Sequence, residues 1–219
     1  MCIRDRYHWD RCSQHAFGEY RRILTYLSRQ RRAFHRALGL IDRRFLVFML
    51  NSYQSFLFNQ ILTEYLEDLQ REQDISFDTV PYSQGRYLFH RELPEALFEH
   101  LLGLTLPVPG WDSQIEDPRI AEITAAVLER EEIKMTDLKV RQLSRIYING
   151  VERPTILLPQ KFCVENVTED ELFDNKKKLT LRFFLPRGGY ATLIVKRLAG
   201  GCRTDPEEPR SAPPLGETV

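Results

Sequence analysis

The chain has 219 residues, of which 42% are hydrophobic and 28% are charged, a composition typical of a globular protein that can bury a sizeable core. Its 31 basic and 31 acidic residues give a formal net charge of zero, which argues against a generally basic nucleic-acid-binding protein. No apolar run reaches the ~18 residues of a membrane-spanning helix, and residues 1–6 lack the apolar core of a signal peptide.

Cysteine and histidine residues lack the spacing of a metal site, so we expect no bound metal. The cysteines are therefore predicted to be free thiols in a reducing compartment, which favours the cytoplasm. They are Cys2, Cys12, Cys163 and Cys202.

Arginine is concentrated at the beginning of the chain. Between Met1 and Arg44, eleven arginines stand against four acidic residues. This asymmetry fits a surface that faces phosphate groups, and it fits a solvated helix face equally well. Residues 1–10, which begin Met-Cys-Ile-Arg-Asp-Arg, look like translated sequencing-adapter sequence, and we expect them to be a non-native start.

Helices are predicted where apolar residues recur with a period near 3.6 residues. The first covers residues 19–40 and is expected to stop at Gly39. The second covers residues 43–70 and is apolar almost all round, which predicts a buried helix. Shorter helices are expected over residues 93–102, 119–131 (with Ile120, Ile123, Val127 and Leu128 buried) and 190–198.

Strand character is found in three places. Residues 75–90 suggest short strands around a turn, residues 153–167 are rich in strand-forming residues, and residues 179–185 alternate between two faces. Residues 103–110 contain Pro107 and Pro109 and are expected to form a rigid loop. Together these elements predict an α/β protein of the α+β type.

A narrow polar stripe runs along the helix predicted over residues 43–70. Its residues recur every four positions, so they share one side of the helix. Amides in a buried helix need hydrogen-bond partners. The stripe either faces water and caps neighbouring loops, or faces a ligand. It consists of Asn51, Ser55, Asn59 and Thr63, with Gln54 beside them.

Two basic segments are candidates for binding anions. Gly188 and Gly189 allow a sharp turn beside Arg187, and the following helix would point free N–H groups at that turn. A tight connection without a ligand fits the same residues. Over residues 134–148, basic and apolar residues alternate, which fits contact with an RNA backbone or an ordinary amphipathic surface.

Two common catalytic motifs are missing from the sequence. It has no Gly-x-x-x-x-Gly-Lys-Ser/Thr loop, which excludes a nucleoside triphosphatase of that type, and no Gly-x-Ser-x-Gly elbow of a serine hydrolase.

Three segments resemble the tRNA pseudouridine synthase D (TruD) family in the family's order. Residues 52–59, preceded by Arg43-Arg44, resemble its Ser-Ala-Tyr-Gln-Ser-Tyr-Leu-Phe-Asn signature, with Tyr53 in place of Ala-Tyr. Residues 106–112 resemble its Leu-Pro-Gly-Tyr-Asp turn, and residues 181–193 resemble its Phe-x-Leu-Pro-Lys-Gly-Ser-Tyr-Ala-Thr segment. The resemblance covers roughly residues 43–198.

The resemblance implies isomerisation of uridine to pseudouridine in tRNA, without cofactor or metal. In this family an aspartate in a Gly-Leu-Lys-Asp motif of the N-terminal half is the key residue, and the nucleotide is flipped out of the RNA stack. No aspartate of this chain stands in that context, so the catalytic role is assigned to no residue. We expect a fragment that lacks the N-terminal catalytic half and is inactive alone.

The family architecture, a catalytic domain interrupted by an inserted domain, implies a division of this chain. Residues 11–150 would belong to the inserted domain, residues 151–199 would return to the catalytic sheet, and residues 200–219 would be a disordered tail. Candidate RNA contacts in the returning piece are Arg187, Gly188, Gly189, Tyr190, Thr192 and Lys196. Those in the inserted domain are Asn51, Gln54, Ser55 and Asn59, and at least half of these four are expected to be structural.

Two other hypotheses stay open at this point. The chain could be a non-catalytic RNA-binding module, whose binding to tRNA would weaken steeply with salt. It could also be a protein-interaction domain that resembles the family only in its core.

Overall fold

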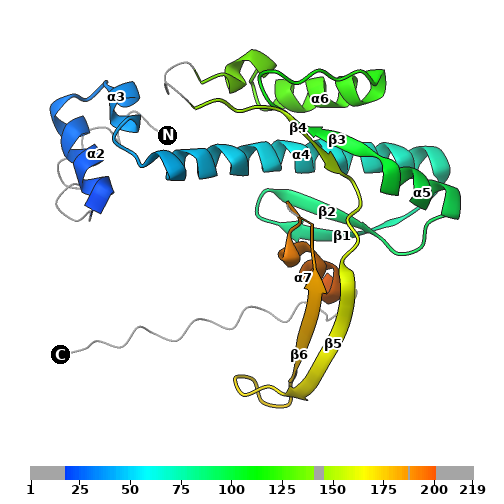
Figure 1. Ribbon diagram of the computed structural model, residues 1–219. Coiled ribbons are helices and arrows are strands. Elements are labelled where there is room, and N and C mark those ends of the chain that lie inside the picture. Colours follow the sequence, from blue (N-terminus) through cyan, green and yellow to red (C-terminus); the bar gives the residue numbers. More distant parts are fainter. Residues whose placement is uncertain (1–17, 141–145, 187, 201–219) are drawn as a thin grey trace. The chain divides into compact units, whose positions relative to one another are not determined.

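The computed structural model describes residues 18–140, 146–186 and 188–200, which form an α+β fold (Figure 1). The described chain divides into two compact units. Of the described residues, 18–75, 93–140 and 146–156 belong to unit 1, and 76–92, 157–186 and 188–200 belong to unit 2. The predicted non-native start and the predicted tail after Gly200 lie outside the described residues. The candidate residue Arg187 also lies outside them.

Unit 1 is built around α4 (Arg43–Gln73), the long helix predicted from the sequence. Asp42 caps its first turn, because the Asp42 carboxylate accepts hydrogen bonds from the backbone N–H groups of Arg44 (2.8 Å) and Phe45 (3.2 Å). Leu57 and Ile61 in its middle are completely buried. Helix α6 (Pro118–Arg130) packs against α4 with the four predicted residues Ile120, Ile123, Val127 and Leu128 all buried.

The expectation that α4 is buried all round is wrong for its first two turns. The side chains of Phe45, Phe48 and Met49 are 42%, 65% and 52% exposed. The other elements of unit 1 cover the later turns, where the buried residues of α4 are concentrated. Apolar composition alone does not show which turns of a helix are covered.

The helix predicted over residues 19–40 is two helices, α2 (Gly18–Arg29) and α3 (Phe34–Leu38). Leu27 and Ala37 are buried, and the two helices contact each other. The turn between them lets two short apolar faces pack together, which a single straight helix does not allow. No glycine or proline marks this turn, so periodicity alone gave a continuous helix.

The rigid loop predicted over residues 103–110 is wrong in its central part. Thr105–Val108 is strand β3, which pairs antiparallel with β4 (Val151–Pro154). Proline is compatible with a strand that has a partner on one side only. Helix α5 (Glu95–Gly103) precedes β3, in agreement with the predicted short helix.

Unit 2 consists of two hairpins and a helix. Strands β1 (Phe77–Tyr82) and β2 (Gly85–His90) form the first hairpin, as predicted. Strands β5 (Gln160–Glu169) and β6 (Lys177–Phe184) form the second, and α7 (Ala191–Gly200) follows β6 and contacts β1. Within the described residues, no helix is long and apolar enough to cross a membrane.

Candidate functional site

The turn between β6 and α7 fixes the start of the helix in unit 2. Gly188 has φ = +91°, a conformation that favours glycine, and the Gly189 N–H donates to the Pro186 carbonyl oxygen at 3.0 Å. A Cβ on Gly189 would lie 3.0 Å from the Leu157 side chain and 3.2 Å from Leu185 Cβ. The turn is therefore closely packed, and it places Tyr190 immediately before the first residue of α7, Ala191.

Tyrosines and a lysine come together where the β1–β2 hairpin meets α7. The Tyr82 and Tyr87 rings stack with centroids 4.2 Å apart and planes at 15°, and the Lys196 Nζ lies 5.7 Å from the Tyr87 centroid. Burial raises the pKa of Tyr87, and the negative charges that Tyr82 and Tyr190 would carry raise it further. We call Tyr82, Tyr87, Tyr190 and Lys196 the tyrosine–lysine cluster.

This cluster has the chemistry that single-stranded nucleic acids require. Nucleic-acid bases stack on aromatic rings, and lysine ammonium groups contact phosphates. Tyr190 is 49% exposed, so one face of the cluster is accessible. The Tyr87 hydroxyl, like that of any tyrosine at neutral pH, keeps its proton and can donate a hydrogen bond.

A second contact ties the end of α7 to the hairpin. Arg197 Nη2 donates to the His90 backbone oxygen at 2.9 Å, and Arg91 Nε pairs with the Asp78 carboxylate at 2.6 Å. Burial lowers the pKa of His90, and the positive charge of Arg197 lowers it further, so this imidazole is neutral at pH 7. A pocket of about 250 Å³ lies here, lined by Asp78, Val80, Phe89, His90, Arg91, Arg197 and Gly200.

In unit 1, Gln54 joins two loops. Its Nε2 donates to the carbonyl oxygens of Pro109 and Asn149, both at 2.9 Å, and the side chain is buried. The Asp112 carboxylate accepts from Asn149 Nδ2 and from the Gly150 N–H, both at 2.7 Å. The amide of Gln54 is thus used for internal packing, which agrees with a structural role.

The rest of the polar stripe on α4 has mixed surroundings. Ser55 Oγ lies 3.5 Å from Arg153 Nη2, and the Arg153 guanidinium lies 4.7 Å from the Phe58 ring centroid. Asn59 is half-buried, and Asn51 is exposed. Of these side chains, Asn51 is the one most open to a ligand from solution.

The candidate residues predicted from sequence therefore form two groups. Gly188, Gly189, Tyr190, Thr192 and Lys196 lie together in unit 2, whereas Asn51, Gln54, Ser55 and Asn59 lie along α4 in unit 1. Arg187 is outside the described residues. Sequence reasoning missed Tyr82, Tyr87, His90 and Arg197. Tyr82 pairs with Gly85 and Tyr87 with Val80, so the two tyrosines are diagonal neighbours on one face of the hairpin, and their spacing around a short turn could have indicated this.

Metal ligands do not gather in the described part of the chain. There, no three His, Cys, Asp or Glu side chains come close enough to hold an ion. Cys163, the one cysteine among the described residues, is exposed and unpaired.

The chain is similar to a well-defined group of known proteins. A family model described as tRNA pseudouridine synthase D (TruD) matches residues 8–198. The chain is 30% identical over 199 residues to "Probable tRNA pseudouridine synthase D 1" of Methanococcus maripaludis, covering 87% of this chain and 49% of that relative. It is 29% identical over 172 residues to "Probable tRNA pseudouridine synthase D 2" of Methanocaldococcus jannaschii, covering 78% of this chain and 40% of the relative.

A solved structure shares the fold. The Methanosarcina mazei crystal structure that carries the tRNA pseudouridine synthase D (TruD) name superposes with a TM-score of 0.56 at 23% identity, covering 82% of this chain and 44% of that one. The chain spans about half the length, or less, of the relatives it matches.

Proposed function

Because the chain belongs to the tRNA pseudouridine synthase D (TruD) family, we propose that it is part of an enzyme that isomerises uridine in tRNA to pseudouridine. Substrate and product are isomers, so the reaction needs no oxidant or reductant. The observation that carries the proposal for this chain is the tyrosine–lysine cluster next to the family-like turn at Gly188 and Gly189.

In this proposal the chain supplies RNA contacts to the reaction. Tyr190 would stack against the flipped uridine or a neighbouring base, and Lys196 would contact a backbone phosphate. Thr192, exposed on the first turn of α7, would add a hydroxyl donor. Arg187 keeps its place as a candidate phosphate contact on sequence grounds only.

The reacting aspartate would come from an N-terminal catalytic half that this sequence does not contain. Two observations support this part of the proposal. No aspartate of the chain stands in the family's Gly-Leu-Lys-Asp context. The two-stranded β5–β6 hairpin also exposes large apolar side chains on the strands, including Phe162, Val164, Val167, Leu179 and Phe184, which a larger catalytic sheet would cover.

The assignment of family domains to this chain is likewise a proposal. We propose the inserted domain over residues 11–150, most of which lie in unit 1, and the returning piece of the catalytic domain over residues 151–199, most of which lie in unit 2. Two elements differ from that division: β4 packs in unit 1, and the β1–β2 hairpin groups with unit 2. The proposed cellular site of action is the cytoplasm, where the enzyme would meet tRNA.

The test is reconstitution. The 219-residue chain would be incubated with a tRNA transcript, alone and together with the N-terminal half of a family member that carries the aspartate motif, and pseudouridine would be quantified by mass spectrometry. We expect product only in the mixture. Product from the chain alone would show that the reacting group lies within it, and no product from a mixture that forms a complex would count against the proposed reaction.

A non-catalytic RNA-binding module is the second candidate, favoured by the absence of the aspartate motif. It predicts salt-sensitive tRNA binding by the chain and no pseudouridine in either incubation.

A further inference from the structure

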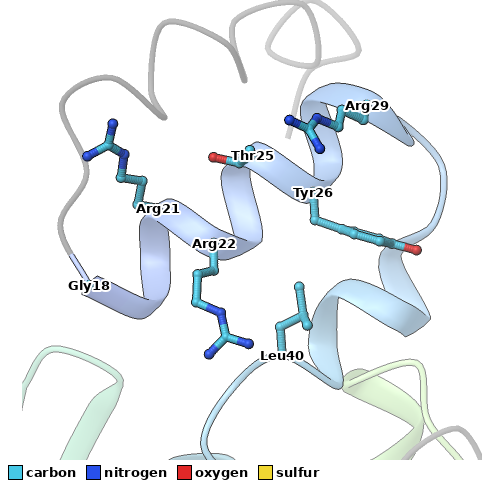
Figure 2. Close-up of a pocket in the computed structure, with 7 residues that line it drawn as sticks. All are labelled: Gly18, Arg21, Arg22, Thr25, Tyr26, Arg29 and Leu40. Atoms are coloured by element: carbon cyan, nitrogen blue, oxygen red, sulfur yellow. The ribbon is translucent and has the colours of Figure 1, made fainter.

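Helix α2 carries a basic pocket that the proposed reaction does not use. The pocket has a volume of about 450 Å³ and lies on unit 1 (Figure 2). It is lined by Gly18, Arg21, Arg22, Thr25, Tyr26, Arg29 and Leu40. Among the described residues of this lining, every ionisable side chain is an arginine or a tyrosine, and none is a carboxylate.

Helix geometry explains why these residues share a surface. Arg21, Thr25 and Arg29 are spaced four apart and form one row along α2, as Figure 2 shows. Arg21 and Arg29 are therefore separated by about 12 Å along the helix axis. Arg22 lies in the adjacent row and extends beside Leu40, which closes the pocket from the segment before α4.

The three guanidinium groups have no carboxylate partner among the side chains that the structure describes. Arg21, Arg22 and Arg29 are exposed, and within the described residues none of them forms an ion pair with a carboxylate. Like charges that share one helix face destabilise the helix unless a counter-ion binds. The surroundings add to this excess, because residues 18–44 contain eight arginines against Glu19 and Asp42 in a chain of zero net charge.

The chemistry of the pocket selects a phosphate-rich ligand. Arginine binds phosphate oxygens with paired N–H donors, and a threonine hydroxyl is a common additional donor to a nucleic-acid backbone. The Tyr26 hydroxyl donates to Gln30 Oε1 at 3.0 Å, so Tyr26 contributes its ring to the lining. A row of cations along a helix suits successive phosphates of a chain better than a single small anion. A polynucleotide backbone meets this description.

We propose that the α2 pocket, through Arg21, Arg22 and Arg29, binds the phosphate backbone of the RNA substrate, in addition to the contacts made by the tyrosine–lysine cluster of unit 2. This inference rests on the proposed function for the identity of the ligand as tRNA. It assigns to α2 a share of the binding energy and no part in the chemistry. The pocket would hold any tRNA in the same way, because phosphate contacts carry no direct sequence information.

The experiment compares two charge-matched variants of the full chain. Arg22→Gln with Arg29→Gln removes two cations from the pocket. Arg71→Gln with Arg130→Gln removes two exposed cations elsewhere on unit 1 that pair with Asp68 and Glu64. Binding of a fluorescent tRNA transcript would be measured by anisotropy over a range of KCl concentrations, with circular dichroism to compare folding.

We expect the pocket variant to bind tRNA on the order of 30-fold more weakly at 0.1 M KCl, with a slope of log K against log salt that is about 1.5 smaller, as expected for two lost phosphate contacts. The tRNA affinity of the control variant should stay within about 3-fold of that of the parent chain. Arg71 and Arg130 are paired with carboxylates, and the loss of an exposed ion pair changes the stability of the fold little. Equal losses in both variants, or no loss in the pocket variant, would overturn the inference.

Two further arms separate this inference from its alternatives. In the reconstituted system, the pocket variant should raise KM and leave kcat unchanged, and a fall in kcat with unchanged KM would overturn the inference. If the reconstituted system makes no pseudouridine but the binding difference persists, the proposed reaction fails and the inference stands. Binding to phosphatidylserine vesicles that depends on Arg22 and Arg29, with tRNA binding unchanged, would assign the pocket to a membrane surface instead.

Discussion

Gly110 and Gly150 lie backbone against backbone where the two loops of unit 1 meet. A Cβ added to Gly110 would overlap the Gly150 backbone nitrogen, and the Trp111 N–H beside it donates to the Ile148 carbonyl oxygen at 3.0 Å. The two loops can approach this closely only because both positions lack a side chain. Two hydrogen bonds from the Gln54 amide hold them in place.

Gly110→Ala is expected to destabilise unit 1. The new methyl group must push the two loops apart, at a cost of about 1–3 kcal/mol or more in the free energy of unfolding. Urea denaturation followed by Trp111 fluorescence in a Trp9→Phe background would measure this cost. Gly103→Ala is the control, because a Cβ at Gly103 meets no atom within 4 Å. Equal stability of the two variants would contradict the close contact.

Gln54→Ala should lower the stability of unit 1 more than Asn51→Ala. Loss of the Gln54 amide leaves the Pro109 and Asn149 carbonyl oxygens without this donor, and each lost hydrogen bond costs about 0.5–1.5 kcal/mol. Asn51 is exposed, so its truncation should change the unfolding free energy by less than about 0.5 kcal/mol. The same denaturation experiment compares them. A larger effect for Asn51 would reverse the structural assignment within the stripe.

Tyr190→Ala and Lys196→Gln should each weaken tRNA binding, for different reasons. Loss of the Tyr190 ring removes a stacking surface worth about 1–3 kcal/mol per base, without changing the dependence on salt. Loss of the Lys196 charge should lower affinity about 5- to 10-fold at 0.1 M salt and reduce the salt slope by about 0.7–0.9. Tyr190→Phe keeps the ring and should bind like the parent chain. If Tyr190→Phe is as weak as Tyr190→Ala, stacking is not the contribution of this residue.

Unit 2 should lose stability as the pH falls below about 6.5, the ordinary pKa of histidine. Burial and the charge of Arg197 lower the folded-state pKa of His90, so between the two pKa values the unfolded chain binds more protons than the folded chain. The contribution of His90 to the stability of unit 2 is therefore complete above the pKa of the unfolded state, and it declines as the pH falls toward the pKa of the folded state. Hydrogen exchange of the peptides covering residues 77–90 would measure this loss of stability with pH. His90→Gln should reduce the difference between pH 7.5 and pH 5, and an unchanged difference would assign the effect to other groups.

The β5–β6 hairpin should make the isolated chain self-associate. Val167 and Leu179 are cross-strand partners, and both are more than half exposed. Exposed apolar strands with unpaired edges favour association between chains. Sedimentation velocity should show larger species at higher protein concentration, and Val167→Lys with Leu179→Lys should shift the chain toward monomer. Monomeric behaviour of the parent chain at all concentrations would contradict this prediction.

The period of the apolar residues was sufficient to predict those helices and strands whose buried face follows from their own sequence. It gave α4, α6 with its four buried residues, and β6, and strand-forming residues around a turn gave the β1–β2 hairpin. It failed where a distant partner decides the structure. Thr105–Val108 becomes a strand because β4 pairs with it, and the 19–40 segment turns back on itself so that Leu27 and Ala37 are both buried.

The candidate site shows the same limit. The turn at Gly188 and Gly189 and the residues that follow it were evident from local sequence. The stacking of Tyr82 on Tyr87 depends on the register of the hairpin, and its position next to Lys196 depends on a contact between segments more than 100 residues apart. Local patterns contain no information about such contacts.

The hydrogen bond from Arg197 to the His90 backbone spans 107 residues of chain, and this separation has a consequence for synthesis. The β1–β2 hairpin leaves the ribosome long before α7 is translated, by about 5–20 s at ordinary elongation rates. An isolated two-stranded hairpin is only marginally stable in water. During that interval the intervening chain, which completes unit 1, can fold first. A delay in translating residues 157–200 would therefore prolong the time for which the hairpin lacks its contact with α7, and with it the exposure of the hairpin to proteases and chaperones.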